Sequence, residues 1–423
     1  MKLCHVYKKQ FKIICLFFLG ILVLFPMVFS YAQTAQELND KINQKNTDID
    51  KLEQEIKQYQ IEIDSLGKQK SSLSVSIKQL DLTRKKLVAD MTITQSKIDK
   101  TNLKIRELSL EIGDKQDVIL NNIEALSLNI RTINEFEQND ILATILSKNN
   151  FTVIWNDIDN ITAVGDKIRE ITVKLKEVKS ALEDTKKETT IAKNELVVLK
   201  AKLADQKKIV DQNTKEKNKL LTQTKNNEAN YQKLLKDRLA KKDAFEKELE
   251  AYESQLKYIL DPSSLPEKGV LSWPLDYIYI TSPFGMRSSG LHQGVDFRAS
   301  IGTPVKALAD GIVAGIGNTD IQCSGVSFGR FILIKYDNGL ASTYGHLSLI
   351  KVVEGQKISR GQVVGYSGNT GYSTGPHLHL SIYPKDAVEV KSIPSKSCPG
   401  RILTQPIAAT NAYLDPMYYL PRQ

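Results

Sequence analysis

The hydrophobic positions in the first part of the chain repeat at alternating intervals of three and four residues. From residue 38 to residue 112 one seam position holds mainly isoleucine and the other mainly leucine, over roughly ten heptads. No proline lies between Pro26 and Pro262, and a proline inside a helix costs about 3 kcal/mol. The pattern predicts a long α-helical coiled coil, and its seam includes Ile42, Ile49, Ile56 and Ile63 with Leu38, Leu52, Leu66 and Leu73.

The pattern changes between about residues 115 and 165, where apolar residues form dense clusters such as Ile141–Leu146 and Phe151–Ile158. Such clusters do not fit a two-stranded seam, so they predict a small helical tip. The heptad resumes at Ile168 and continues to Leu256. The simplest topology is an antiparallel hairpin over residues 33–261. A parallel dimer of two chains stays open as an alternative, because heptads do not fix helix direction.

The returning arm carries polar residues at several seam positions, including Thr185 and Asn213. Its lower part is therefore either a hinge or a segment that packs elsewhere, and the pattern leaves both open. The helical pattern stops at Asp261-Pro-Ser-Ser-Leu-Pro266, which predicts a linker over residues 262–269.

From residue 270 to residue 384 the pattern consists of short Val/Ile/Tyr-rich runs separated by glycines. Asp337-Asn-Gly339 is a strong hairpin signal between two of these runs. Closely spaced strands without intervening helices predict an all-β, antiparallel domain of about 115 residues, enough to bury a core of its own. The expected strands are 305–308, 311–316, 331–336, 340–344, 362–366 and 377–383. Residues 385–423 form a C-terminal extension.

The N-terminus predicts export. Four lysines, the last at Lys12, precede an apolar run from Ile13 to Phe29, and Ser30-Tyr-Ala32 supplies small residues for cleavage. Residues 1–32 are thus expected to be a signal peptide, with an uncleaved membrane anchor as the alternative. Either way, the remainder is expected to be secreted or to lie in the periplasm or cell envelope.

Charge and cysteine content refine this picture. The net charge is +9, but lysines and acidic residues are interspersed, which is typical of a solvated helical surface and argues against nucleic-acid binding. Loss of the signal peptide would leave two cysteines, Cys323 and Cys398. In an exported chain these two favour a disulfide over a zinc site, because neither has a neighbouring cysteine at finger-type spacing.

Four of the five histidines lie in three short fragments of the β-rich region. His292 and Asp296 are four residues apart, and His377 and His379 are two apart, so in extended backbone each pair points to one side of its strand. His346 lies in the third fragment. Two imidazoles and a carboxylate would leave an open tetrahedral position on a zinc ion, which is typical of catalytic zinc.

The order of these fragments resembles the successive motifs of the lysostaphin/LytM-type zinc endopeptidases of peptidoglycan. The motifs include Phe284-Gly-Met-Arg287, His292-Gln-Gly-Val-Asp296, Tyr344-Gly-His-Leu347 and Gly375-Pro-His-Leu-His379. The resemblance implies that His292, Asp296 and His379 hold Zn²⁺, and that His346 and His377 are catalytic. The alternative is a degenerate domain that binds the cell wall without a metal.

Three further residues are expected near the substrate groove. Tyr366 and Tyr372 flank a glycine-rich loop, where either can line the groove or lie on the surface. Arg287 either meets a substrate carboxylate or braces its own loop.

The whole layout resembles the EnvC/PcsB type of murein hydrolase or hydrolase activator. This resemblance implies a role in cell division or daughter-cell separation, in which the coiled-coil tip docks on the FtsE/FtsX division transporter and docking relieves autoinhibition. The expected function is a secreted zinc-dependent endopeptidase that hydrolyses peptide cross-bridges. The alternative is a non-enzymatic envelope scaffold that activates another murein hydrolase.

Overall fold

The computed structural model describes residues 35–422 apart from 68, 70–71, 138–150, 257, 259–262, 264 and 288–289. The chain divides into two compact units, one of residues 1–44 and 103–189 and the other of residues 45–102 and 190–423. The expected signal peptide and the centre of the expected tip, including Ile141–Leu146, lie outside the described residues. Within the described part, no helix is long and apolar enough to span a membrane.

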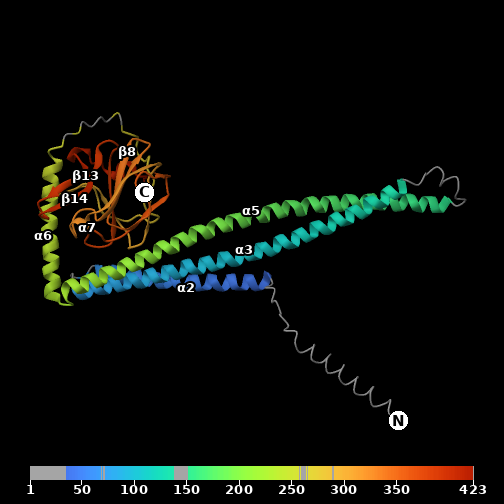
Figure 1. Ribbon diagram of the computed structural model, residues 1–423, viewed down its shortest axis with the longest axis horizontal. Helices are drawn as coiled ribbons and strands as arrows, with labels where there is room; N and C mark the ends of the chain where they lie inside the picture. Colours follow the sequence, from blue (N-terminus) through green and yellow to red (C-terminus); the bar gives the residue numbers. More distant parts are fainter. Residues whose placement is uncertain are drawn as a thin grey trace, which may run out of the picture. The chain divides into compact units, whose positions relative to one another are not determined.

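Among the described residues, four long helices precede the β-rich part of the chain (Figure 1). They are α2 (Ala35–Gly67), α3 (Leu73–Glu137), α5 (Phe151–Thr224) and α6 (Glu228–Glu253). In both units α3 and α5 run antiparallel: Lys115 Nζ bonds Thr185 Oγ1 at 2.7 Å in one unit, and Lys217 Nζ meets Asp81 Oδ1 at 2.6 Å in the other. The fold therefore confirms the helical hairpin.

The outgoing arm consists of two helices, whereas the heptads predicted one. Gly67 ends α2, and Ser72 caps α3 by accepting a hydrogen bond from the Val75 amide at 3.3 Å. The helix α2 then lies antiparallel to α3, with Lys86 Nζ donating to Gln60 Oε1 at 2.8 Å. The sequence hid this break because Leu66 and Leu73 keep the seven-residue spacing across it.

A second break separates α5 from α6. Lys225 and Asn226 both adopt positive φ angles of 51°, and the Asn227 side chain caps α6 by accepting from the Asn230 amide. Glu228 and Tyr231 tie the start of α6 to the start of α3, at Leu73 and Ser76. The rest of α6 packs against the β-rich part. The end of the returning arm is thus a segment that packs elsewhere, one of the two possibilities that the polar seam positions left open.

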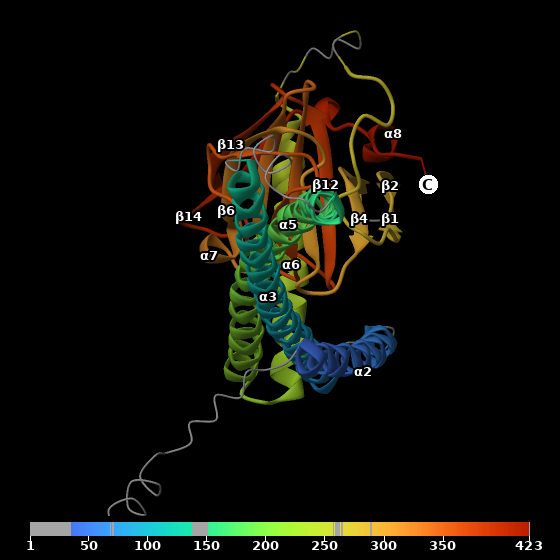
Figure 2. The ribbon, with the colours of Figure 1, turned by 90° about the vertical axis from the view of Figure 1, so that its right-hand side faces the viewer.

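The β-rich part is antiparallel throughout its described strand pairs. Its largest sheet has seven strands in the order β1-β4-β12-β8-β7-β6-β10 (Figure 2). A three-stranded sheet β5-β11-β9 and the hairpins β2-β3 and β13-β14 complete it. The strands are β1 (Ile280–Ser282), β2 (Gly285–Arg287), β3 (Gly290–His292), β4 (Val295–Arg298), β5 (Pro304–Lys306), β6 (Gly311–Asn318), β7 (Arg330–Tyr336), β8 (Leu340–Gly345), β9 (Leu347–Ile350), β10 (Lys357–Ile358), β11 (Val363–Ser367), β12 (His377–Pro384), β13 (Val388–Ser395) and β14 (Arg401–Ala408).

All six strands expected from the sequence are present, at 304–306, 311–318, 330–336, 340–345, 363–367 and 377–384. Apolar residues of the main sheet build a core that includes Phe297, Ile332 and Leu380, each fully buried. The sequence did not predict the strands β1–β4, β9 and β10 or the C-terminal hairpin β13–β14. Short helices, α7 (Thr319–Gln322), η2 (Thr410–Ala412) and α8 (Pro416–Tyr419), lie between and after these strands.

The two remaining cysteines form the disulfide that the sequence favoured. Cys323 follows α7, and Cys398 lies in the turn between β13 and β14. The bond therefore joins the C-terminal hairpin to a loop of the main sheet.

Backbone crowding makes Gly311 a sensitive position in this fold. A Cβ at Gly311 would lie 2.4 Å from the Lys335 carbonyl oxygen on the paired strand, which cannot move without breaking the ladder, whereas a Cβ at Gly375 would meet nothing within 4 Å. We expect Gly311→Ala to destabilise the β domain by about 1–3 kcal/mol and Gly375→Ala to have little effect. Trp273 fluorescence during denaturant unfolding, in a Trp155→Phe background, measures both; equal midpoints would contradict this packing.

Candidate metal centre

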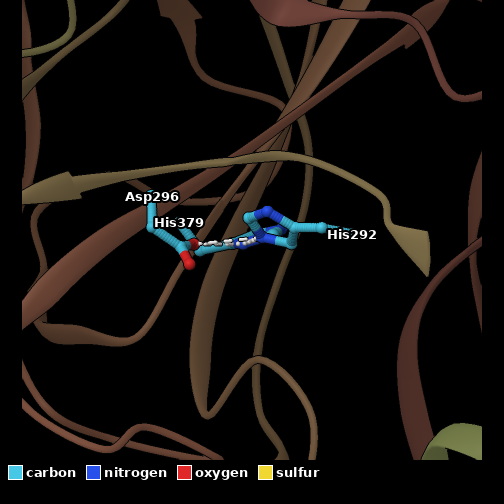
Figure 3. A group of neighbouring side chains, drawn as sticks. All are labelled: His292, Asp296 and His379. Carbon is cyan, nitrogen blue, oxygen red and sulfur yellow. Dashed lines mark hydrogen bonds and ion pairs between the residues drawn. The ribbon is translucent and has the colours of Figure 1, made fainter. Parts of the chain in front are cut away.

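Three potential ligands converge where β3, β4 and β12 meet. In the β4–β12 register His379 lies opposite Asp296, and His292 ends β3. His379 Nδ1 lies 2.8 Å from Asp296 Oδ1, His292 Nε2 lies 3.3 Å from the same oxygen, and the two ring nitrogens are 3.3 Å apart. Figure 3 shows the three side chains directed at one another. These are the three residues that the sequence predicted as ligands.

The outer hydrogen bonds of the two imidazoles orient their lone pairs inward. His292 Nδ1–H donates to the Pro283 carbonyl at 2.8 Å, and His379 Nε2–H donates to Ser381 Oγ at 2.9 Å. With those protons placed, His292 Nε2, His379 Nδ1 and the Asp296 carboxylate are three acceptors facing one point. A cation is the partner that such a set requires.

The spacing of these donors also suits zinc. Tetrahedral zinc with bonds of about 2.0–2.2 Å places neighbouring ligand atoms about 3.3–3.6 Å apart, and the observed separations are 2.8–3.3 Å. The observed separations are slightly shorter than those expected around zinc. The residues present therefore fit a zinc ion with two nitrogen ligands and one oxygen ligand.

The carboxyl of Asp296 is held in its ionised form. Burial opposes ionisation, but the ring nitrogens of His292 and His379 beside the carboxyl outweigh it and keep the pKa of Asp296 far below its usual range. Arg287 NH2 lies 3.4 Å from Asp296 Oδ2. Arg287 thus braces the metal-ligand carboxylate and also lines the neighbouring cavity.

His346 and His377 stand beside the three potential ligands. Their ring centroids are 4.6 Å apart, and His377 Nε2 lies 3.7 Å from Asp296 Oδ1. His346 Nδ1–H donates to the Thr370 carbonyl and His377 Nδ1–H to the Gly375 carbonyl, both at 2.8 Å. Each ring therefore keeps Nε2 available for proton transfer.

Two features of His346 mark it as an unusual position. Its φ angle is +60°, which a residue with a side chain rarely adopts. Burial, with His377 and His379 nearby, lowers the pKa of His346 well below its usual value. A neutral imidazole at this place is able to accept a proton.

Gly294 makes room for the candidate ligand His379. A Cβ at this position would lie 2.6 Å from two atoms of the His379 ring and from the Leu380 carbonyl oxygen. The glycine in the His292-Gln-Gly-Val-Asp296 motif is therefore a packing requirement of the site.

The site opens into a cavity of about 290 Å³. Arg287, Tyr372 and the histidines line it, so Tyr372 follows the groove-lining one of its two alternatives. The helix α6 also lines it, through Phe245, Glu246, Leu249 and Glu250. Sequence reasoning missed α6 as part of the site, although Phe245, Leu249, Tyr252 and Leu256 have the spacing of one apolar helix face.

Tyr366 does not line this groove, so that expectation is wrong. Its ring is 3% exposed and packs with Leu87, Ile209 and Ile301. Its hydroxyl donates to Asp205 Oδ2 on α5 at 3.1 Å. The bulky ring is more favourably buried against the helices than exposed beside the polar site.

Comparison with known proteins agrees with the site chemistry. Residues 290–391 match the model of "Peptidase family M23". The chain is 40% identical over 126 residues to "DD-carboxypeptidase/endopeptidase Mpg" of Neisseria meningitidis, covering 28% of each chain. It is 40% identical over 121 residues to "Peptidoglycan DD-endopeptidase ShyA" of Vibrio cholerae, covering 28% of this chain and 27% of that one.

Lysostaphin of Staphylococcus simulans is 43% identical over 104 residues, which cover 25% of this chain and 20% of lysostaphin. Its solved structure aligns with 33% of this chain and 48% of that chain, at 30% identity and a TM-score of 0.25. The chain thus spans less than a third of the length of the curated relatives it matches. Residues 290–391 are therefore similar to peptidases of family M23, among them lysostaphin.

Proposed function

We propose that this chain is a zinc-dependent endopeptidase that hydrolyses peptide cross-bridges of peptidoglycan. The observation that carries the proposal is the convergence of His292 Nε2, His379 Nδ1 and Asp296 Oδ1 beside the free Nε2 atoms of His346 and His377. The names of the relatives, which include a peptidoglycan DD-endopeptidase, support the same substrate class.

The roles of the side chains follow from their protons. His292, Asp296 and His379 would hold zinc, which when bound lowers the pKa of a coordinated water to about 7 and polarises a carbonyl. The neutral Nε2 of one of the other two histidines accepts the proton of the attacking water. An Nε2–H of this pair then donates to the leaving amine or to the developing negative charge on the peptide carbonyl.

Regulation by the helical region is part of the proposal. Four side chains of α6 line the cavity that also contains the histidines, so a peptide substrate needs this helix to move. We infer that α6 holds the enzyme in a closed state. We further propose export to the cell envelope, a role in cell division, and contact of the tip at about residues 115–165 with the FtsE/FtsX transporter.

A non-enzymatic activator is the second candidate, and α6 lying across the site favours it. The complete set of two imidazoles and one carboxylate favours the enzyme, because an activator has no need of three converging acceptors. The proposed endopeptidase therefore stands first.

Hydrolysis by the full chain tests this function. Phe245→Ala loosens α6, and we expect the zinc-loaded variant to release new amino groups from purified cell-wall sacculi until a chelator is added. In the same background, His379→Ala should lose both zinc and hydrolysis. His346→Ala should keep zinc while hydrolysis falls by about 10²-fold or more. Absence of hydrolysis by the zinc-loaded Phe245→Ala chain, with α6 shown to be displaced, would falsify the proposed function.

Ser381 offers a test of the metal centre that does not depend on hydrolysis. Its buried hydroxyl accepts the His379 Nε2–H bond, and loss of such an outer partner typically weakens metal affinity 10–100-fold. We expect Ser381→Ala to show this loss in competition with a zinc-binding dye. Ser342→Ala is the matched control, since Ser342 is equally buried but bonds Tyr336. Equal zinc affinities in both variants would show that Ser381 does not position the ligand.

The closed state is expected to weaken as the pH rises. Burial raises the pKa of Glu253 on α6 to about 7, and its neighbours there, Tyr413, Gln293 and the Ala408 backbone, are uncharged. When α6 is released, Glu253 would titrate near its ordinary pKa of 4.5. The neutral carboxyl therefore stabilises the docked helix by about 3 kcal/mol relative to the ionised carboxylate. This stabilisation is complete below pH 4.5 and is lost as the pH rises through 7.

Distances between spin labels at Ala244→Cys on α6 and Lys357→Cys on β10, two exposed positions, measure this change. The wild-type chain should release α6 between pH 6 and pH 8, whereas Glu253→Gln should remain docked. Identical pH profiles in the two proteins would exclude Glu253 as the titrating group.

A further inference from the structure

The C-terminal extension contacts α6 at three separate places. The family match ends at residue 391, so the second half of the hairpin and all that follows lie beyond it. Yet the hairpin and Tyr413 supply partners for Phe245, Glu248 and Glu253 of α6. Figure 1 shows α6 beside β13 and β14.

The first contact is a carboxylate that caps the hairpin turn. Glu248 Oε1 accepts from the Lys396 amide at 2.7 Å, and Oε2 accepts from the Ser397 amide at 2.8 Å and the Ser397 hydroxyl at 2.6 Å. Burial opposes ionisation, but these hydrogen bonds lower the pKa of Glu248 below its usual value. Charge-assisted bonds of this kind are roughly twice as strong as neutral ones.

The second contact is an apolar seat for Phe245, which is 2% exposed. The seat consists of Cys323, Val326, Ile393, Cys398, Leu403 and Ile407, with Leu249, Tyr252 and Leu256 of the helical segment packed at its edge. Because the Cys323–Cys398 disulfide lies within this cluster, it holds two walls of the seat together. Burial of a phenylalanine side chain is worth about 1.5–3 kcal/mol.

The third contact joins the end of α6 to the vicinity of the metal centre. Glu253, which has no exposed surface, accepts from the Tyr413 hydroxyl at 2.7 Å and from Gln293 Nε2 at 2.9 Å. Gln293 follows the metal-ligand candidate His292 in the chain. This contact therefore fixes the position of α6 relative to the groove.

We propose that the hairpin β13–β14, together with Tyr413 and the Cys323–Cys398 disulfide, is a receptacle whose ligand is α6. The receptacle recognises an amphipathic helix that presents an aromatic anchor at Phe245, a carboxylate at Glu248 and a carboxyl group at Glu253. Three, five and eight residues separate these positions, which places them along one side of the helix around Leu249 and Tyr252. The receptacle thus holds α6 across the cavity rather than serving in the chemistry itself.

The regulatory consequence rests on the proposed function, but the docking can be measured without it. In the full chain with spin labels at Ala244→Cys and Lys357→Cys, the docked helix gives one narrow distance distribution. Glu248→Gln places an amide N–H₂ against backbone N–H donors, so it loses hydrogen bonds that the carboxylate accepts. We therefore expect at least a tenfold rise in the ratio of released to docked helix. Phe245→Ala should act in the same direction through loss of the apolar seat.

Asp237→Asn is the matched control, because Asp237 is a carboxylate of α6 that pairs with Lys241 in its own helix. This variant should keep the wild-type distance distribution. Unchanged distributions in both Glu248→Gln and Phe245→Ala would overturn the receptacle. If α6 is released but the zinc-loaded chain leaves sacculi uncut, the receptacle is supported and the proposed hydrolysis is wrong.

Discussion

The antiparallel register of β4 against β12 is the constraint on which the site depends. It places Asp296 directly opposite His379, and the short β3–β4 connection returns His292 to the same point. Side chains alternate between the two faces of a strand, so a slip of one residue would carry His379 to the opposite face. The buried neighbours Phe297, Leu378 and Leu380 exclude that slip, because it would bring these apolar side chains to the polar face. The hydrophobic core therefore specifies the ligand geometry.

The helical region contacts the β domain at several places. Asp64 of α2 and Asp205 of α5 form ion pairs with Arg298 and Lys351 of the β domain, while α6 lines the histidine cavity. The partly exposed ion pairs contribute little individually. The contacts of the buried Phe245 and Glu253 and of the part-buried Glu248 are stronger, and they belong to the helix that lines the cavity.

The motifs led to three side chains that do converge, His292, Asp296 and His379. However, His292 and Asp296 lie on two strands, β3 and β4, and not on one strand as their spacing suggested. The heptads predicted the coiled coil because their spacing determines which residues share a helix face. The break after Gly67 was missed because the leucine seam continues across it. The role of α6 was missed because an apolar helix face has the same spacing whether it packs on a helix or on a sheet. Glu248 meets Ser397 across 149 positions, and no local pattern reports such a pairing. Tyr366 shows the converse error, since a glycine-rich loop suggested exposure where tertiary packing buried the ring.

The coordination of zinc in the full-length chain tests the central claim most directly. X-ray absorption at the zinc edge should show two imidazole nitrogens and a carboxylate oxygen at about 2.0–2.2 Å, and His379→Ala should abolish stoichiometric binding. Sulfur ligands, a shell of imidazoles without carboxylate, or unchanged binding by His379→Ala would contradict a metal centre built by the β4–β12 register.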